Sequence, residues 1–216
     1  MGVTSPTAPP GWSTRTTTSR APIPARRETS TRGRPTRASS SRSKLLAETA
    51  AEAVAADERV LEVGVGSGYV AATVREATGA AVVGCDIGPD ACAAARESGV
   101  EVVRADLTAP FAAGSADVVL CNPPYLPTPP EREWDDPLEY ALSGGEDGRR
   151  VVRPFLNDVG RVLRPDGRAY LLVSSLTGLD AVRELATAAG LKTRERAEES
   201  FPFERLVVLE ITLSDS

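Results

Sequence analysis

The sequence predicts an α/β fold: a seven-stranded, mostly parallel sheet with helices on both faces and an antiparallel last strand. Two observations predict it. Apolar runs rich in Val, Leu and Ala alternate with helix-forming segments along residues 45–190, which is typical of a parallel sheet covered by crossover helices. The last two predicted strands, near 191–199 and 204–212, are joined by a segment too short for such a helix, so they should pair antiparallel.

Helix formers, caps and breakers delimit the elements. Residues 45–56 combine strong helix formers with an apolar stripe, which predicts a first helix. Pro89 near a first turn and Gly99 just past the end mark a later helix. The predicted strands before the final pair are 59–63, 80–86, 100–104, 116–121 and 168–174. The remaining predicted helices are 68–78, 89–98, 149–163 and 180–189, with a turn at 164–167 after the third of them.

Two segments lie outside this alternation. Residues 1–43 are rich in Ser, Thr, Pro and Arg and lack periodic apolar residues, which predicts a disordered tail before a folded domain at 44–216. A transit peptide has the same Arg- and Ser-rich, acid-poor composition, and a third hypothesis is that a reading-frame or start-site error produced this stretch. Residues 126–148 form a Pro- and acid-rich excursion, whose Trp134 and Tyr140 are expected either to pack under the loop or to anchor a substrate.

Charge and residue usage exclude several classes of protein. Residues 45–216 hold sixteen Lys/Arg and twenty-nine Asp/Glu, a net charge of −13, whereas proteins that grip a phosphate backbone need clustered basic residues. No His occurs, so a Ser-His-Asp or Cys-His hydrolase is excluded. Cys85, Cys92 and Cys121 lack C-x-x-C spacing, which argues against a metal site or disulfides and for a reducing, cytoplasmic location. No apolar run approaches the ~20 residues of a membrane span.

A glycine-rich turn follows the first predicted strand. Residues Leu61 to Gly68 read LEVGVGSG, with glycines also at Gly64 and Gly66. Such a turn lets the backbone approach a ligand closely, and the helix that follows supplies free N–H groups. The spacing differs from the G-x-G-x-x-G of dinucleotide sites, and Glu62 would oppose a pyrophosphate but suit an ammonium group. Both features disfavour an NAD-dependent oxidoreductase.

Two further acids follow the next predicted strands. Asp86 ends the second strand, where a carboxylate can accept both ribose hydroxyls, and Asp106 follows the third, where it can accept an adenine amino hydrogen. Their neighbours Ile87 and Leu107 belong to the same predicted site. Acids at three successive strand ends fit a cofactor with an amine, a ribose and an adenine but no phosphate. That description is met by S-adenosylmethionine.

The segment Asn122-Pro123-Pro124-Tyr125 follows the strand predicted at 116–121. A planar NH2 is a poor nucleophile because its lone pair is delocalised, but the Asn122 side-chain oxygen and the Pro123 carbonyl can accept its two hydrogens and orient it. Both prolines lack N–H and have fixed φ, which keeps the carbonyls aimed, and Tyr125 can cover the planar group by stacking. The segment therefore predicts methyl transfer to a planar nitrogen, driven mainly by proximity and without a strong base.

These motifs resemble the class I S-adenosylmethionine-dependent methyltransferases. Among them the chain is similar to the HemK/PrmC release-factor glutamine methyltransferases, especially their short archaeal and eukaryotic branch. The resemblance covers residues 44–214, and its most specific marks are Glu62 to Gly68, Asn122 to Tyr125 with Leu126-x-Thr128-Pro129 after it, and Gly144-Gly145-x-x-Gly148. It implies a Rossmann-like seven-stranded sheet, methylation of the glutamine in the Gly-Gly-Gln motif of a class 1 release factor, and a small zinc-binding activator protein docked along the edge strand at Val100–Arg104.

The sequence departs from this family before the first helix. The family carries a loop near Tyr-x-Pro-x-x-Asp-Ser that helps close over the cofactor. The corresponding residues are Arg37-Ala-Ser-Ser-Ser-Arg-Ser43, of which only Ser43 matches. If the tail is genuine, this departure implies weakened cofactor binding or activity.

Other acceptors and a different class stay open at this point. A nucleic-acid N6-adenine or N2-guanine methyltransferase is an alternative, because Asn-Pro-Pro-Tyr serves any planar NH2. The acidic charge of residues 45–216 and the lack of a basic recognition domain argue against nucleic acid. A protein-lysine methyltransferase is a second alternative. A non-catalytic cofactor-binding scaffold paired with an activator would belong to a different class.

Overall fold

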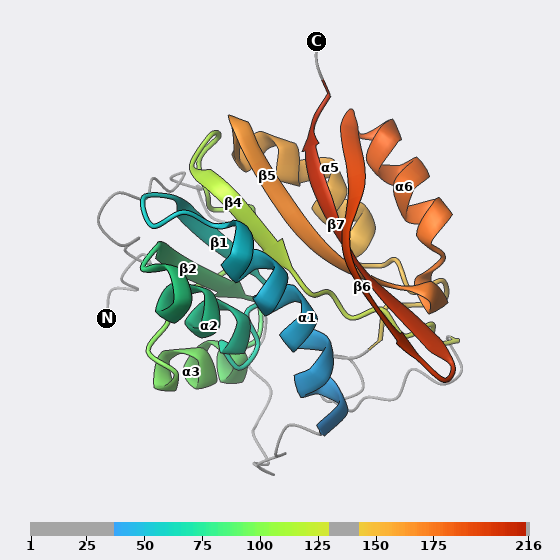
Figure 1. The fold of residues 1–216 in the computed structure, drawn as a ribbon, viewed down its shortest axis with the longest axis horizontal. Helices are drawn as coiled ribbons and strands as arrows, with labels where there is room; N and C mark the ends of the chain where they lie inside the picture. The colour runs from blue at the N-terminus through green and yellow to red at the C-terminus, as the bar shows by residue number, and fades with distance from the viewer. Residues whose placement is uncertain (1–36, 130–142, 215–216) are drawn as a thin grey trace, which may run out of the picture.

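The computed structural model describes residues 37–129 and 143–214. Its strands are β1 (Arg59–Val63), β2 (Ala81–Asp86), β3 (Glu101–Arg104), β4 (Ala116–Cys121), β5 (Leu163–Ser174), β6 (Leu191–Phe201) and β7 (Glu204–Leu213). They form one sheet in the order β3-β2-β1-β4-β5-β7-β6 (Figure 1). Strand β7 runs antiparallel to both of its neighbours, and the other strand pairs are parallel. The predicted fold class, including the antiparallel last strand, is confirmed.

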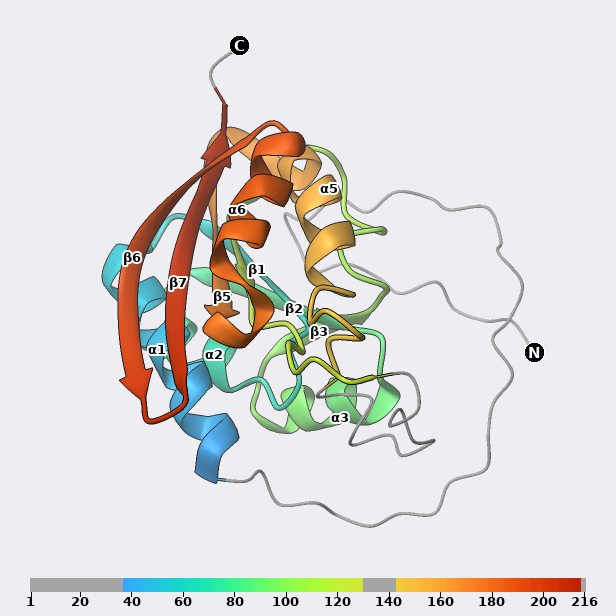
Figure 2. The ribbon, with the colours of Figure 1, turned by 90° about the vertical axis from the view of Figure 1, so that its right-hand side faces the viewer.

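Helices cover both faces of the sheet. They are α1 (Arg37–Ala53), α2 (Tyr69–Thr78), α3 (Pro89–Glu97), α5 (Val152–Val162) and α6 (Leu179–Ala188), with a short 3-10 helix, η2 (Ser175–Thr177), after β5. One hydrophobic cluster joins α1 and α2 to one face, and a second joins α5 and α6 to the other. Figure 2 shows α1 and α5 on opposite sides of the sheet.

The sequence pattern explains these positions. In α5 the buried residues recur at the spacing of one helical face, being Val152, Phe155, Leu156, Val159 and Val162. Strands β1 and β4 are buried almost throughout their length, because a parallel sheet covered on both faces needs apolar side chains pointing both ways.

Two elements begin earlier than the sequence predicts. Helix α1 starts at Arg37, not at Leu45, so residues 37–43, assigned from sequence to the tail, are helical. Arg42, in this early part of the helix, makes an ion pair with Glu204, a tertiary contact that helix propensity does not reveal. The assignments for residues 1–36, and for Trp134 and Tyr140, lie outside the described residues.

Strand β5 also extends back beyond its predicted start. Leu163 pairs with Ala116, and Arg168 pairs with Val118. The predicted turn at 164–167 therefore sits within a register shift of the β4–β5 ladder. An irregularity of this kind re-aims the strand without ending the pairing.

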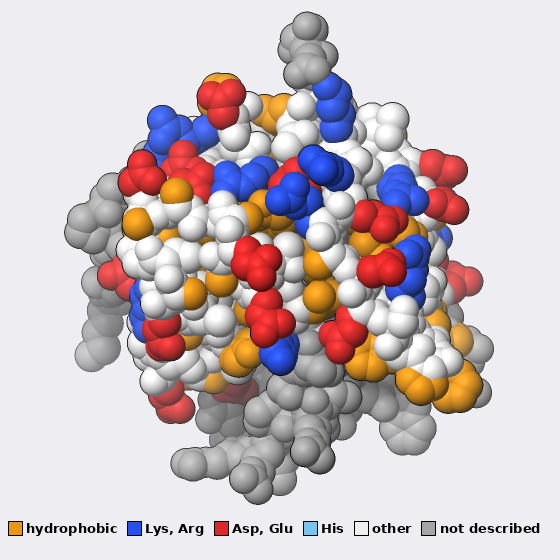
Figure 3. Space-filling model, in the orientation of Figure 1, with side chains coloured by type: hydrophobic (Ala, Val, Ile, Leu, Met, Phe, Trp, Pro, Cys, Tyr) orange, Lys and Arg blue, Asp and Glu red, His pale blue; other side chains and the backbone are white. Residues whose placement is uncertain are grey.

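The outer strand β6 carries a dense row of charged side chains. Charges on an edge strand discourage pairing with other chains, and here they are Lys192, Arg194, Glu195, Arg196, Glu198 and Glu199. Figure 3 shows acidic and basic side chains interspersed on the face that includes this hairpin. Neither positive nor negative charge predominates on this face.

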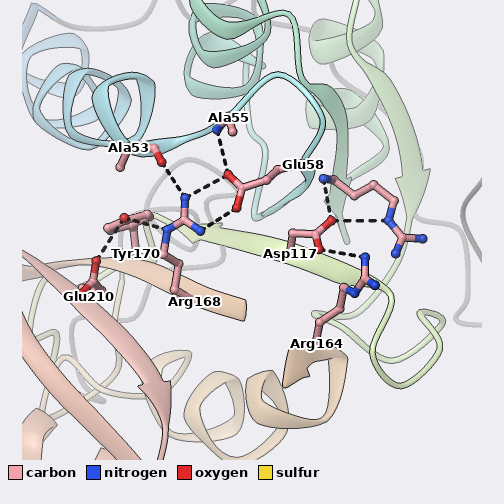
Figure 4. Close-up of polar contacts among 9 residues, drawn as sticks. Ala53, Ala55, Glu58, Asp117, Arg164, Arg168, Tyr170 and Glu210 are labelled. Carbon is pink, nitrogen blue, oxygen red and sulfur yellow. Dashed lines mark hydrogen bonds and ion pairs between the residues drawn. The ribbon is translucent and has the colours of Figure 1, made fainter. Parts of the chain in front are cut away.

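A polar cluster at the amino edge of the sheet joins α1 to β5 (Figure 4). The Arg168 guanidinium donates to both carboxylate oxygens of Glu58, at 2.7 and 2.9 Å, and to the Ala53 carbonyl at 2.6 Å. It also donates to the Tyr170 hydroxyl at 3.0 Å. These hydrogen bonds hold the pKa of Glu58 below its ordinary value. One arginine therefore fixes the end of α1, the loop after it and the start of the regular part of β5.

We expect Arg168→Gln to lower the free energy of unfolding by about 2 kcal/mol, because it leaves the Glu58 carboxylate and the Ala53 carbonyl without their donor in a partly buried site. Arg183→Gln is the matched control: Arg183 pairs with Asp180, whose side chain is 91% exposed, and with Glu195, whose side chain is 36% exposed, so its loss at the surface should cost no more than about 1 kcal/mol. Urea unfolding followed by circular dichroism measures both. Equal losses would contradict the role given to Arg168.

Candidate active site

The register of the sheet aligns the carboxyl ends of its central strands. Val63, the last residue of β1, pairs with Cys85 of β2 and with Cys121, the last residue of β4. The next residues, Gly64 and Asn122, therefore leave the sheet from adjacent strands, which lie about 4.8 Å apart. The glycine turn and the Asn-Pro-Pro-Tyr segment meet at one edge, as the sequence predicts.

The glycine turn after β1 leaves open space above its backbone. Gly64 and Gly66 have φ of +74° and +51°, the left-handed region that favours glycine. A Cβ placed on either would meet no atom within 4 Å. A Cβ on Gly68 would instead lie 3.0 Å from the Cα of Ala95 in α3. The first two glycines thus fit a cofactor lying against the backbone, while Gly68 permits close helix packing.

Asp86 links the glycine turn to the end of β2. Its Oδ2 accepts from the Gly66 N–H at 3.1 Å and its Oδ1 accepts from the Gly88 N–H at 2.8 Å. Each carboxylate oxygen keeps a lone pair for a further donor, so this side chain can still accept ribose hydroxyls. Ile87, directly after it, is 52% exposed. The exposed Ile87 side chain beside the fixed Asp86 carboxylate fits a nucleoside, whose base is apolar on its faces and whose ribose carries hydroxyls.

Glu62 lies within β1, not in the turn where the sequence prediction placed it. It is 2% exposed, and its Oε2 accepts from the Ala71 N–H of α2 at 2.8 Å. Burial raises the pKa of Glu62 to about 8; the Ala71 N–H opposes this rise and the charge of Asp86 adds to it. The carboxyl is thus held against the first turn of α2. Its contact with a cofactor ammonium group stays a prediction.

The loop after β3 holds the other two predicted cofactor residues. Asp106 is exposed, and Leu107 has a φ of +48°, the one positive value at a non-glycine residue within 37–129 and 143–214. A left-handed conformation costs a leucine roughly 1–2 kcal/mol. The Cys85 Sγ donates to the Leu107 carbonyl at 3.3 Å, which helps to hold this backbone in place. Strained backbone of this kind concentrates at functional sites.

Asn122 presents a free acceptor at the end of β4. Its Nδ2 donates to the Ser43 Oγ at 3.1 Å. Its Oδ1 makes no hydrogen bond to any residue that the structure describes. Pro123 is buried and Pro124 is partly exposed, so the backbone after the amide is both conformationally fixed and packed. The side-chain oxygen is therefore the polar atom that Asn122 offers to an incoming N–H.

Tyr125 differs from the stacking surface that the sequence predicts. It is 6% exposed, and the Arg42 guanidinium lies 5.3 Å from its ring centroid. Burial raises the pKa of the Tyr125 phenol, the charge of Arg42 opposes this rise, and the nearby Glu204 carboxylate adds to it. The Arg42 guanidinium covers one face of the ring, so Tyr125 forms part of the buried lining of the site. A cation–π contact of this kind contributes about 1 kcal/mol of stability.

The glycines after the excursion, at 144, 145 and 148, pack against the same segment. The Gly144 N–H donates to the Leu126 carbonyl at 2.8 Å, and the Thr128 N–H donates to the Gly145 carbonyl at 2.9 Å. A Cβ on Gly148 would lie 2.6 Å from the Tyr125 carbonyl oxygen. Gly148 therefore allows the chain to approach the Asn-Pro-Pro-Tyr backbone closely, and the two hydrogen bonds join the ends of the excursion.

The described residues support neither a cysteine nucleophile nor a metal centre. Burial raises the pKa of the Cys85 and Cys121 thiols, so neither is activated as a nucleophile. Across the described ranges, no group of three or more His, Cys, Asp or Glu side chains could hold a metal ion. No helix in those ranges is long and apolar enough to cross a membrane.

Sequence reasoning missed the residues that reach the site from α1 and β7. Arg42 and Ser43 contact Tyr125 and Asn122, yet both fall in the stretch assigned to the tail. Glu204 was expected only as a strand boundary. The one available signal was the match of Ser43 to the family loop. Arg42 and Glu204 carry no local pattern, because their pairing joins residues 162 positions apart.

Comparisons with known proteins agree with this geometry. A family defined as "Methyltransferase domain" matches residues 60–139. A Methanocaldococcus jannaschii protein named as a protein N5-glutamine methyltransferase is 34% identical over 156 residues, covering 69% of this chain and 79% of the relative. Human methyltransferase HEMK2 is 32% identical over 178 residues, covering 77% and 83%. The E. cuniculi Mtq2–Trm112 complex, described as responsible for methylation of the eRF1 translation termination factor, matches with a TM-score of 0.65 and 27% identity over 84% of this chain and 98% of that one.

Fold, site and comparisons together define an S-adenosylmethionine-dependent methyltransferase. Within that class, the chain belongs to the HemK family of protein N5-glutamine methyltransferases. The open turn at Gly64 and Gly66, with Asp86 and Ile87 beside it, fits the cofactor that this class uses.

We expect Gly148→Ala to reduce methyl transfer at least tenfold, because its Cβ would displace the Tyr125 carbonyl and with it the Asn122 backbone. Gly114→Ala is the matched control: Gly114 also has a positive φ, +61°, but a Cβ there would meet nothing within 4 Å. The positive φ should cost each variant about 1 kcal/mol of stability, and Gly148→Ala should lose more because of its 2.6 Å contact; urea unfolding measures both losses. If the two variants also lose activity equally, the close approach at Gly148 has no role in the site.

The buried Glu62 carboxyl should make stability depend on pH. Its pKa is about 8 in the folded chain and about 4.5 when exposed, so between these values the folded state binds more protons than the unfolded state. The free energy of unfolding should then fall as pH rises from about 5 to 8, by up to about 1.4 kcal/mol per pH unit, and level off above that. Glu62→Gln should remove this slope and be the more stable protein at pH 8. Parallel pH profiles for both proteins would contradict a raised pKa.

Proposed function

We propose that this chain methylates the side-chain amide nitrogen of a glutamine in a class 1 release factor, within its Gly-Gly-Gln motif. The observation that carries the proposal is the state of Asn122. Its Nδ2 is engaged by Ser43, and its Oδ1 faces no partner among the described residues. An unpaired amide oxygen next to the cofactor turn suits an acceptor that itself brings an N–H.

The residues of the site orient a planar amide and need no base. Asn122 Oδ1 accepts one hydrogen of the acceptor NH2, and the rigid carbonyl of Pro123 accepts the other. Each such hydrogen bond is worth only about 1 kcal/mol, so their value lies in aligning the nitrogen. S-adenosylmethionine supplies the methyl group from its sulfonium. The nitrogen gains this methyl and loses one proton to solvent, which leaves a neutral N-methyl amide.

Charge favours a protein acceptor over a nucleic acid. The net charge of −13 over residues 45–216 opposes binding to a phosphate backbone. The relatives support a glutamine acceptor, since the M. jannaschii protein is named for N5-glutamine and the E. cuniculi complex for methylation of eRF1. The cytoplasmic location expected from the cysteine content accords with such a substrate and stays a prediction.

We further propose that a small zinc-binding activator protein docks along β3. This strand ends the sheet and pairs only with β2 among the described strands. Its exposed residues are Glu101 and Arg104, and a strand with an open edge can accept another strand. Val100 was included in this edge from sequence, but it precedes the strand and is 4% exposed, so it belongs to the core. The E. cuniculi relative is itself a complex with Trm112.

Incubation with labelled S-adenosylmethionine, release factor and activator, followed by mass spectrometry of the product, tests the function. We expect one methyl group on the Gly-Gly-Gln glutamine. Asn122→Ala should abolish transfer, because it removes the side-chain oxygen that holds the acceptor nitrogen in place. The dissociation constant for the cofactor should change by less than about threefold. Asn157→Ala, at an exposed position on α5, should leave transfer unchanged.

Other outcomes would redirect the assignment. Methyl groups on lysine, or on adenine or guanine in added RNA or DNA, would replace the proposed substrate. Retained transfer by Asn122→Ala would refute the role of the amide. Tight cofactor binding without transfer to any of these acceptors would indicate a non-catalytic scaffold.

A further inference from the structure

The first part of α1 is tied to the start of β7. Arg42 Nη2 lies 2.8 Å from Glu204 Oε2, with side chains 26% and 9% exposed. The other carboxylate oxygen of Glu204 accepts from the Ser174 hydroxyl at 2.7 Å. Both oxygens of this nearly buried carboxylate are thus satisfied, which fixes its orientation and that of the guanidinium paired with it.

Topology explains why this pair lies at the active edge. Strand β7 is antiparallel to β5, and Ser174, the last residue of β5, pairs with Leu206 of β7. Glu204, the first residue of β7, therefore lies near the end of β5, where it accepts from the Ser174 hydroxyl. That end of β5 is on the edge where β1 and β4 finish, since these strands are parallel. A glutamate at the beginning of β7 can therefore reach the site that the other strands build with their ends.

The same guanidinium touches the catalytic segment. Arg42 covers the ring of Tyr125 at 5.3 Å. The next residue, Ser43, accepts the hydrogen bond from Asn122 Nδ2 at 3.1 Å. Two consecutive residues of α1 thus contact the last and the first residue of Asn122 to Tyr125.

We propose that Arg42 is a positioning residue: by pairing with Glu204 it holds the first part of α1 over the Asn-Pro-Pro-Tyr segment and keeps Ser43 bonded to the Asn122 amide. The bond to Nδ2 orients the amide, so that Oδ1 points to the acceptor nitrogen. The inference rests on the proposed function, because the Asn122 Oδ1 would point to the glutamine amide nitrogen that we propose as the methyl acceptor.

The rest of α1 does not depend on this ion pair. Leu46, Ala47 and Ala50 are fully buried against the sheet, and the last residue of the helix, Ala53, is bonded by Arg168. Loss of the Arg42–Glu204 pair should therefore release the start of α1 while the helix stays docked. A functional effect can then be separated from unfolding.

The test uses the full chain with its release factor and activator. Arg42→Gln and Ser43→Ala should each lower kcat about tenfold, the effect of one orienting hydrogen bond, with the dissociation constant for S-adenosylmethionine changed less than about threefold. Ser43→Thr keeps the hydroxyl and should retain activity. The exchange Arg42→Glu with Glu204→Arg should recover at least part of what Arg42→Glu alone loses. Arg205→Gln is the matched control, because Arg205 follows Glu204 on β7 but pairs with Glu198, and its kcat should match that of the wild type.

A second readout does not need activity. The side-chain NH2 resonances of Asn122, assigned by their loss in Asn122→Asp, should shift in Arg42→Gln and Ser43→Ala and stay in place in Arg205→Gln. Unmoved resonances, or a kcat for Arg42→Gln equal to that of the wild type, would overturn the positioning role. If the wild type transfers no methyl to the release factor, the proposed function fails, and the resonances still decide whether Arg42 orients the amide.

Discussion

The pairing of β1 with β4 is the constraint on which the site depends. These strands are distant in sequence, but Val63 and Cys121 are partners in the sheet, and each ends its strand. After β1 the chain forms the glycine turn, which has open space beside Gly64 and Gly66, and after β4 it continues into Asn122 and two prolines. Because the strands are parallel, both segments must emerge at the same edge, where ligands of open α/β sheets bind. A register shift between them would separate donor and acceptor.

Helix α1 connects this edge to the opposite one. Its end at Ala53 is bonded by Arg168, which also holds Glu58, and its Arg42 pairs with Glu204 at the active edge. Between these contacts its apolar face is buried in the sheet. The first contact serves stability, and the second lies beside the Asn-Pro-Pro-Tyr segment, where we propose that it positions Asn122. The two ends of the helix are thus held differently, one by a hydrogen bond from Arg168 of β5 and the other by an ion pair to Glu204 of β7.

Charge is arranged to suit a cationic cofactor and a neutral acceptor. Glu62 and Asp86 lie near one another, and the charge of Asp86 adds to the raised pKa of Glu62. Burial is the main cause of this raised pKa, and a positively charged ligand beside the two carboxyl groups would favour their ionised forms. On the acceptor side, Asn122 and two prolines carry no charge. This division is consistent with the reaction that we propose, which relies on orientation of the acceptor and uses no histidine.

The sequence by itself determined the fold class, most strand boundaries and the two polar segments of the site. Their signals are local: apolar periodicity defines β1 and β4, and glycine and proline define the turns after Val63 and Cys121. Only the tertiary structure decided that Glu62 is buried against α2, that Arg42 covers Tyr125, and that Ser43 holds Asn122. These contacts depend on the antiparallel return of β7 and on where α1 docks. Pairings between residues so far apart follow from packing in three dimensions, which no window of neighbouring residues encodes.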